Sequence, residues 1–393
     1  MTSPATHRRS GVVLLALVLV AANLRMALTS VPPVVLDIQR STGWGDVELG
    51  LLTTLPVIAM GAFALVVPSL AARIGRSRAV WGALGILTVA LAMRLAGTVP
   101  GVMHVSVIAA GIGIALASGL VPGIVREQLP ASIGKATGAW TAAMFLGAGA
   151  AAAFTVPLAQ LTGSWQAALA VWAIPAALAL VAWTVIERPR ASPAEKVARV
   201  RLGDLPWRNR AAWSLTAYMA INSLVYYAAL AWVAASLDER GFSEEAAGWL
   251  FGLLTVSQVA AALTLPAWSQ RMRSRRLLIA TTSVITAASL VVLGVAPTFL
   301  PVIVMFLIGA SNSGGFSISL SLLSEFSPDA ASAARLTAMA FTVTYLVAAT
   351  GPVAAGALLE AADSWTVVFC ALALVALAQL IPIAGLRRGT IIT

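Results

Sequence analysis

The sequence predicts an all-α membrane protein with twelve transmembrane helices. Three observations support this: an apolar composition, recurring long apolar segments and the placement of the basic residues. Of the 393 residues, 60% are hydrophobic and only 10% are charged, whereas a soluble domain keeps about a quarter of its residues charged. We therefore expect most of the protein surface to face lipid hydrocarbon.

Apolar segments of about 20 residues, the length a helix needs to cross a bilayer, follow one another along the whole chain. The first begins at Gly11, and we expect it to be retained because no small-residue cleavage site followed by a soluble region appears. No long soluble domain remains once the apolar segments are removed. The predicted spans are 11–36, 46–70, 79–98, 102–124, 136–160, 165–186, 211–236, 244–268, 277–296, 299–323, 336–360 and 364–386.

The basic residues predict the orientation of these spans. With the N-terminus inside, 21 of the 25 Lys and Arg residues fall on the cytoplasmic side, as the positive-inside rule requires. Arg40 and Arg240 fall in outside loops, and Arg25 and Arg94 fall within spans. We therefore expect a cell (inner) membrane location, both termini cytoplasmic, and contacts between basic loops and anionic lipid headgroups. This topology accounts for the net charge of +10, so no nucleic acid partner is expected.

The two halves of the chain resemble each other at a shift of about 198 residues. The shift pairs residues in register with the predicted spans: Pro68 with Pro266, Arg73 with Arg271, Gly111 with Gly309, and Pro130 with Pro328, while Trp165 lies near Trp365 at a shift of 200. A duplication of this kind predicts two pseudo-symmetric six-helix bundles. We place the N-terminal bundle at 1–186, a cytoplasmic linker at 187–210 and the C-terminal bundle at 211–393.

Arg25 is the most informative residue inside a span. An arginine at the centre of a membrane helix costs about 2.5–3.5 kcal/mol on insertion scales, so its presence indicates a role. No Asp or Glu lies well inside any predicted span, and a permanent positive charge at low dielectric attracts an anion. We expect Arg25 to contact substrate; the alternative is a structural arginine satisfied by backbone carbonyls or Asn23. Arg94, near the outer end of its span, is expected to snorkel or to make a packing contact; the alternative is a binding role.

The C-terminal half offers a polar-aromatic face. Asn222 and Tyr226 are spaced i, i+4 and share a helix face, with Tyr227 beside them. Tyr226 is expected either to donate its hydroxyl to a ligand or to be an interfacial aromatic. The 198-residue shift pairs Arg25 with Ser223, so a cation in one half corresponds to this patch in the other.

The remaining candidate binding residues share a polar or bulky side chain inside a span: Trp140, Met144, Gln258, Asn312, Phe316 and Tyr345. Trp140 and Met144 share a face that is typical of helix packing, with a cavity wall as the alternative. The row of Ser313, Ser317 and Ser321 beside Asn312 indicates close packing rather than substrate contact.

The sequence indicates neither an enzyme nor a metalloprotein. His7 and His104 lie far apart in sequence, the single cysteine Cys370 falls inside the last span, and no metal-ligand cluster follows from them. No phosphate-binding loop and no nucleophile-base arrangement appears. We therefore expect no cofactor and no metal, and we disfavour a membrane enzyme or receptor. The functional unit is expected to be a monomer.

The loop after the second span reads Arg73-Ile74-Gly75-Arg76 and resembles the signature of the major facilitator superfamily between its helices two and three. In that family the basic residues of this loop anchor the cytoplasmic gate. Here Ala72 stands where the signature has an acidic residue, and Pro68 where it has its first glycine. The resemblance implies the major facilitator fold, with a reduced charge network at the gate.

An ordered series of short segments over essentially the whole chain is similar to the cyanate and 2-nitroimidazole transporter family (CynX/NimT) of the major facilitators. The segments include Leu24-Arg25, Thr29-Ser30-Val31-Pro32-Pro33, Gly50 to Pro56, Gly111 to Ala115, Tyr226-Tyr227, Glu239-Arg240-Gly241, Gly314-Gly315-Phe316 and Gly351-Pro352. Thr29, in the second segment, is included among the candidate binding residues. The chain departs from the family pattern at Ser118, Val233-Ala234 and Thr344.

The resemblance implies a small polar solute as substrate, often anionic or azole-like, moved across the cell membrane by alternating access. The alternative is an exporter of neutral drugs or metabolites in which Arg25 is structural. Because no Asp, Glu or His lies in the membrane interior to carry a proton, we expect facilitated diffusion or solute exchange. Glu127 and Glu325, near-equivalents in the repeat, are predicted to be gate elements paired with loop arginines.

Overall fold

The computed structural model describes residues 4–186, 202–272, 274–386 and 391–392. Within these ranges the chain forms α-helices and short 3-10 helices and contains no β-strand. Most of the predicted linker 187–210 lies outside the described residues; its described part includes the short helix η4 (Leu202–Asp204).

Eleven helices in the described part of the chain are long and apolar enough to cross a membrane, and one bent pair brings the number to twelve. This agrees with the predicted number of spans. The pair is α3 (Asp46–Ala64) and α4 (Val67–Ile74), and the helix axes differ by 58°. The span predicted over 46–70 therefore corresponds to this bent pair and not to a single straight helix. The break lies just before Pro68, which has no backbone N–H to continue the helical hydrogen bonds and clashes with the preceding turn.

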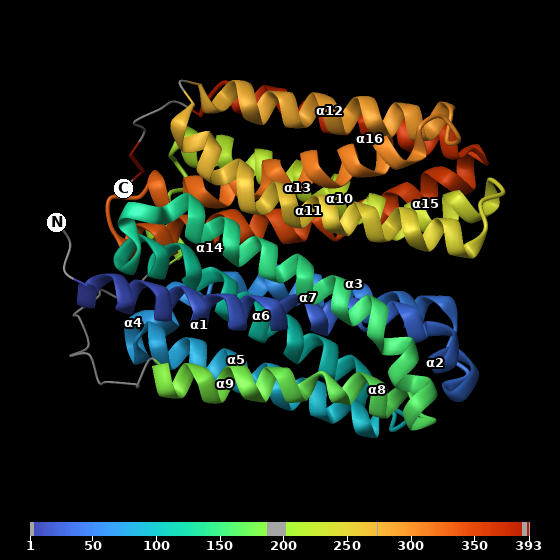
Figure 1. Cartoon of the computed structure of the whole chain (residues 1–393), viewed down its shortest axis with the longest axis horizontal. Helices are drawn as coiled ribbons and strands as arrows, with labels where there is room; N and C mark the ends of the chain where they lie inside the picture. The colour runs from blue at the N-terminus through green and yellow to red at the C-terminus, as the bar shows by residue number, and fades with distance from the viewer. Residues whose placement is uncertain (1–3, 187–201, 273, 387–390, 393) are drawn as a thin grey trace. The chain divides into compact units, whose positions relative to one another are not determined.

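The described chain divides into two compact units. Unit 1 comprises residues 1–131, 143–205 and 329–338. Its helices, besides α3 and α4, are α1 (Pro4–Thr29), η1 (Pro32–Val34), α2 (Val35–Thr42), α5 (Arg76–Ala92), η2 (Met93–Ala96), α6 (Val102–Gln128), η3 (Pro130–Ser132), most of α7 (Ile133–Thr162), α8 (Trp165–Val171) and α9 (Ala173–Ile186). Within this unit α6 packs against α1, α3 and α5, and α9 packs against α1 and α5 (Figure 1).

Unit 2 comprises residues 132–142, 206–328 and 339–393. Its helices are α10 (Arg210–Glu239), α11 (Glu244–Arg271), α12 (Arg275–Val295), α13 (Pro301–Glu325), the second half of α14 (Ala330–Ala348), α15 (Thr350–Ala362), α16 (Trp365–Ala378) and α17 (Leu380–Ile383). Here α13 packs against α10, α11 and α12, and α16 packs against α10 and α12. The pattern repeats the one in unit 1.

The same glycine contact holds the central helix of each unit. A Cβ atom added to Gly111 on α6 would lie 2.4 Å from the carbonyl oxygen of Pro56 on α3, and one added to Gly309 on α13 would lie 2.4 Å from that of Leu254 on α11. Shifting Pro56 and Gly111 by 198 residues gives Leu254 and Gly309. The internal repeat predicted from sequence therefore recurs as a backbone contact, of the kind that small residues allow between membrane helices.

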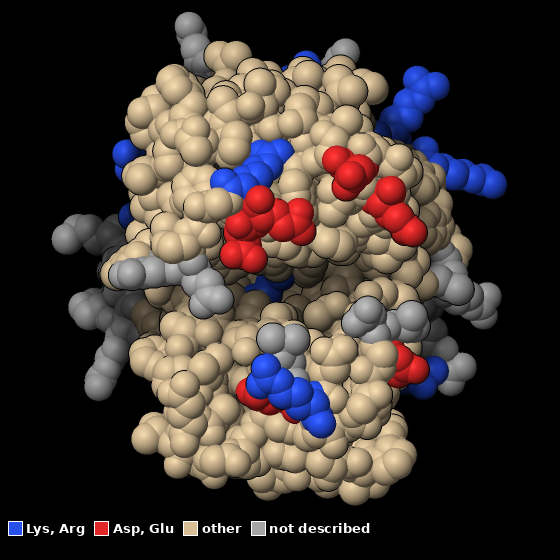
Figure 2. Space-filling view, turned by 90° about the vertical axis from the view of Figure 1, so that its right-hand side faces the viewer, with Lys and Arg blue, Asp and Glu red and all other residues tan. Residues whose placement is uncertain are grey.

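A tryptophan hydrogen bond is the second contact that recurs in both units. The indole N–H of Trp165 on α8 donates to Ser41 Oγ at 2.8 Å, and that of Trp365 on α16 donates to Glu239 Oε2 at 2.7 Å. In unit 2, Arg240 also donates to the Leu293 carbonyl at 2.6 Å, and burial lowers the pKa of Arg240 from its ordinary value. Figure 2 views the molecule from the end at which α2 lies, and most of the visible surface there is uncharged.

Candidate functional site

A small, mostly apolar pocket lies inside unit 2. It encloses about 20 Å³ and is lined by Val225, Tyr226, Ala229, Leu230, Phe251, Leu254, Gln258, Thr286, Ile308 and Asn312. Three of these residues, Tyr226, Gln258 and Asn312, were predicted from sequence as binding residues. The structure brings them together from α10, α11 and α13.

Two asparagines fix the helices that carry this pocket. Asn222 on α10 donates its side-chain amide to the Asn312 carbonyl at 3.4 Å, and Asn312 on α13 donates to the Asn222 carbonyl at 3.3 Å. Both side chains are buried. Asn222 Oδ1 has no hydrogen-bond partner among the described residues, and a buried amide oxygen is normally paired. This atom is therefore a candidate acceptor for a donor from outside the protein.

Thr286 lines the pocket but was not among the binding residues predicted from sequence. Its Oγ1 lies 2.7 Å from Ser311 Oγ and donates to the Thr282 carbonyl at 3.0 Å, which fastens α12 to α13. A threonine hydroxyl in a membrane helix commonly bonds to the carbonyl four residues earlier, so Thr286 did not stand out from the other threonines. The i, i+4 spacing of Thr282 and Thr286 was the available signal.

The size and charge of the pocket restrict what it accepts. None of the ten described residues that line it is charged. A cavity needs about 10–15 Å³ to hold one water molecule, so 20 Å³ admits a group of very few atoms. The pocket therefore suits a small uncharged group, held mainly by apolar contacts, with the side-chain amides of Gln258 and Asn312 in its lining.

Three predicted site residues of unit 1, Asn23, Arg25 and Thr29, lie on α1. Arg25 and Asn23 are 5% and 4% exposed. Asn23 donates to the Leu19 carbonyl at 2.8 Å, and its Oδ1 is buried with no hydrogen-bond partner in the described structure. Arg25 thus lies buried within a membrane helix, close in sequence to an amide oxygen that can accept a hydrogen bond.

Thr29 fastens α1 to α7. Its hydroxyl lies 3.0 Å from the Arg25 carbonyl and 3.0 Å from the Ala148 carbonyl. About two turns before Thr29 on α1 the two backbones meet, because a Cβ atom on Gly147 would clash with the Ala22 carbonyl oxygen. These contacts fix the part of α1 that carries Arg25.

Arg94 does not snorkel, so that part of our prediction is wrong and the packing alternative is confirmed. The side chain is 0% exposed. It donates to the Ala27 carbonyl at 2.8 Å, to Ser30 Oγ at 3.0 Å and to Ser106 Oγ at 3.1 Å. These acceptors lie within unit 1, so the guanidinium turns into the helix bundle instead of toward the headgroups.

The other predicted binding residues do not line the pocket of unit 2. Trp140, Met144, Phe316 and Tyr345 are each buried, and Tyr345 packs edge-on against Phe341, with 5.3 Å between ring centroids. Tyr227 packs edge-on against Tyr226 at 5.2 Å.

The serine row on α13 faces helices, as predicted. Ser313 Oγ donates to the Gln258 carbonyl on α11 at 2.9 Å, whereas Ser317 and Ser321 donate to carbonyls of their own helix. All three side chains are buried. The row therefore allows α11 and α13 to pack closely and fixes the turn of α11 that carries Gln258.

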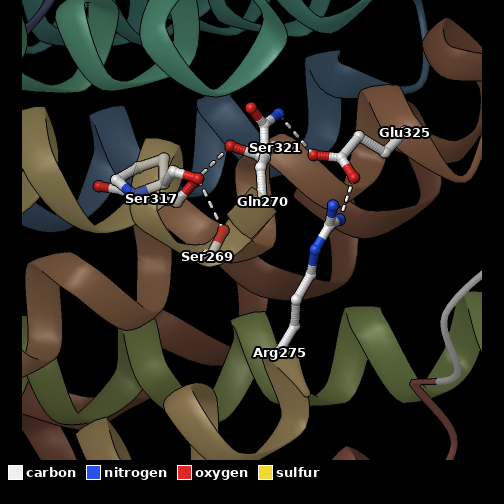
Figure 3. A network of polar contacts seen from close by, with 7 residues as sticks. Ser269, Gln270, Arg275, Ser317, Ser321 and Glu325 are labelled. Carbon is white, nitrogen blue, oxygen red and sulfur yellow. Dashed lines mark hydrogen bonds and ion pairs between the residues drawn. The ribbon is translucent and has the colours of Figure 1, made fainter. Parts of the chain in front are cut away.

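Equivalent ion pairs lie at the C-terminal ends of α6 and α13. Glu127 pairs with Arg76, and Glu325 pairs with Arg275, which confirms the predicted pairing of both glutamates with loop arginines. Glu325 also accepts a hydrogen bond from Gln270 Nε2 at 3.0 Å. Figure 3 shows Gln270 and Arg275 both directed at the Glu325 carboxylate. No group of three or more His, Cys, Asp or Glu residues suited to a metal ion occurs among the residues the structure describes.

Comparison with known proteins identifies the family. The family model of the Major Facilitator Superfamily matches residues 13–243 and 224–389. The chain belongs to the major facilitator superfamily. This facilitator is 30% identical over 382 residues to the 2-nitroimidazole transporter of Escherichia coli K12, covering 97% of the chain and 96% of the relative. It is 30% identical over 352 residues to the cyanate transport protein CynX of the same organism, covering 88% and 89%.

Solved structures show the same fold. The proton:xylose symporter XylE superposes with a TM-score of 0.79 at 16% identity, covering 96% of this facilitator and 95% of the symporter. The human organic anion transporter MFSD10 superposes with a TM-score of 0.73 at 13% identity, covering 97% and 100%. Membership of the family, together with the relatives of 30% identity, makes the protein a multi-span membrane transporter of a small molecule and not an enzyme.

Proposed function

We propose that this facilitator is a secondary transporter of a small anion or small polar solute, such as a cyanate-like ion, a carboxylate or an azole, and that it works by alternating access. The observation that carries the proposal is the pocket of unit 2, about 20 Å³, where Gln258, Thr286 and Asn312 interrupt a mostly apolar lining. The relatives named as transporters of cyanate and of 2-nitroimidazole support the same class of substrate.

In this proposal the two kinds of polar group have different tasks. In unit 2, the side chains of Tyr226, Gln258, Thr286 and Asn312 offer hydrogen bonds to uncharged polar groups. In unit 1, Arg25 offers a positive charge, and its planar guanidinium is suited to gripping an anion or a flat polar group with two parallel hydrogen bonds. The alternative is an exporter of neutral drugs or metabolites in which Arg25 is structural.

The test is a ligand panel on the purified protein. Thermal stabilisation and binding are measured with cyanate, acetate, acetamide and 2-nitroimidazole for wild type, Arg25→Gln, Arg25→Lys and the control Arg78→Gln, which removes an exposed arginine. We expect Arg25→Gln to weaken anion binding roughly ten- to a hundredfold, since hydrogen bonds to charged groups contribute about 1.5–3 kcal/mol.

Arg25→Lys should restore anion binding in part, because lysine keeps the charge without the planar fork. The control should bind like wild type. Unchanged anion binding in Arg25→Gln, or a loss that appears equally in Arg78→Gln, would contradict the assigned role of Arg25. Misfolding of Arg25→Gln would favour the structural reading.

We also propose that bundles 1–186 and 211–393 are joined by a cytoplasmic linker at 187–210 and that both termini are cytoplasmic in the cell inner membrane. The distribution of Lys and Arg supports this orientation. Single cysteines placed in the linker and at each terminus of a Cys370→Ser background should react with a membrane-impermeant reagent from the cytoplasmic side alone. Labelling of the linker from outside would contradict the proposed topology.

A further inference from the structure

Arg94 places a second positive charge inside unit 1. The guanidinium is fully buried, and its three acceptors are the Ala27 carbonyl and the hydroxyls of Ser30 and Ser106. Ser106 in turn donates to the Ala90 carbonyl at 2.7 Å. Each acceptor is neutral, so the hydrogen bonds are satisfied while the charge is not neutralised.

No carboxylate among the described residues pairs with Arg94. Ion pairs in the described part of the chain include Arg40 with Asp37, Arg76 with Glu127 and Arg275 with Glu325, and none of these involves Arg94. Arginine stays protonated at any physiological pH. In a region of low dielectric constant such a charge acts over a longer distance than it does in water.

The charge of Arg94 is directed at the same stretch of α1 that carries Arg25. Ala27 and Ser30, which Arg94 contacts, are spaced i, i+3 and share a helix face. Arg25 lies two residues before Ala27, so its Cβ points to nearly the opposite side of the helix. The two cations are therefore separated by about one helix diameter, about 10–12 Å.

The C-terminal half shows that the fold does not require this arginine. The 198-residue shift takes Arg94 to Val292, Ser106 to Val304 and Ser30 to Ala228. Val304 and Ala228 are buried in one hydrophobic cluster of unit 2, and Val292 packs against it. The same position in the repeated framework is thus filled by apolar packing in unit 2 and by a charge in unit 1.

We propose that Arg94 is a positioning residue that sets the charge selectivity of the transporter: it holds the end of α1 and adds a positive potential that favours an anion at Arg25 over a neutral solute of the same shape. The inference rests on the proposed contact between Arg25 and the substrate. A unit charge at about 12 Å and an effective dielectric constant of about 20 changes an anion's binding constant about tenfold.

The experiment compares two probes of nearly identical shape, acetate and acetamide, by binding titration on the full-length purified protein. Arg94→Gln removes the charge. The triple variant Ser30→Ala, Arg94→Val, Ser106→Val also removes it, and copies the apolar packing of unit 2. Arg94→Lys keeps the charge, and the control Ser106→Ala removes one hydrogen bond while keeping the arginine.

We expect the preference for acetate over acetamide to fall about tenfold in both neutral variants, and to change less than about twofold in Arg94→Lys and Ser106→Ala. An unchanged preference in the neutral variants would overturn the inference, as would an equal loss of both probes, which is the result expected of a purely structural residue. Failure of both neutral variants to fold would also overturn it, because Arg94 would then serve the fold alone.

Arg25→Gln, measured in parallel, separates this inference from the proposed function. If Arg25→Gln loses acetate binding while Arg94→Gln keeps the preference, the inference fails and the proposed function stands. If Arg25→Gln binds acetate like wild type, the proposed function fails and the inference with it. A wild-type protein that binds neither probe, or binds both equally, would overturn both.

Discussion

Unit 1 and unit 2 repeat one arrangement of helices, but they bury different chemistry. Among the described residues, the two buried charged side chains, Arg25 and Arg94, both belong to unit 1. Unit 2 buries neutral amides and hydroxyls instead, including Asn222, Thr286 and Asn312. The helix contacts are alike in the two units, but the buried polar residues differ. The residues that determine helix packing are therefore not the ones that determine the polarity of the interior.

One pair of equivalent positions shows how the difference arises. On α6, Gly113 packs so closely on α5 that a Cβ atom would lie 2.9 Å from the Ala83 carbonyl oxygen. Its equivalent on α13 is Ser311, which instead contacts the hydroxyl of Thr286 on α12 at 2.7 Å. A serine in place of a glycine thus turns a tight helix contact into a polar wall, and the pocket lies beside it.

The largest loss of stability is expected at the glycine contact that both units share. Gly111→Ala and Gly309→Ala should each lower the free energy of unfolding by about 1–3 kcal/mol, because the added methyl group meets backbone that does not move aside easily. The controls are Gly82→Ala and Gly252→Ala, whose added Cβ has nothing within 4 Å. Thermal and denaturant unfolding of the purified variants checks this. Equal stability of the test and control variants would show that the repeated contact does not hold the helices.

A smaller effect on the free energy of unfolding is expected at the equivalent ion pairs, and it should differ between the two units. The Arg275 and Glu325 side chains are 19% and 16% exposed, whereas those of Arg76 and Glu127 are 25% and 53% exposed. Glu325 also accepts a hydrogen bond from Gln270. Glu325→Gln should therefore cost about 1.5 kcal/mol, and Glu127→Gln less than about 1 kcal/mol, as measured by unfolding. A larger loss in Glu127→Gln would reverse the comparison.

The smallest effect is expected for Thr286, which lines the pocket of unit 2. Thr286→Val keeps the side-chain shape and removes the hydroxyl, so acetate and acetamide should each bind about fivefold more weakly, which corresponds to about one hydrogen bond. Thr281→Val is the matched control, since Thr281 is an exposed threonine on the same helix. Binding titrations measure both. If Thr286→Val binds like wild type, the pocket of unit 2 does not contact these solutes.

Helix positions and the repeat could be predicted from the sequence because both depend on hydrophobic length and on residues at fixed spacing. The helix break before Pro68 could not be predicted in this way. Pro266, the equivalent of Pro68 in unit 2, lies inside the continuous helix α11. Pro56 likewise lies inside α3 without breaking it. Proline in a membrane helix is tolerated when neighbouring groups satisfy the freed carbonyl, and that depends on tertiary packing that the sequence pattern does not contain.

Part of the candidate site could be predicted, because polar side chains within apolar spans can be recognised from sequence alone. Tyr226, Gln258 and Asn312 stood out as polar side chains in apolar spans, and the structure brings them to one pocket. The partners of Arg94 were not predictable, because Ala27 and Ser30 lie 67 and 64 residues away in sequence. Helical periodicity relates residues three or four positions apart, and it carries no information about contacts of that range.

The glycine contacts at Gly111 and Gly309 also preserve a trace of the protein's ancestry. Each contact is made largely by main-chain atoms, so substitutions that later changed the surrounding side chains left it in place. The two halves of a duplicated gene can diverge until few identities remain, yet a main-chain contact still marks which positions descend from one ancestral residue. Counting from these two glycines therefore aligns the halves and identifies, position by position, where each copy acquired its own chemistry.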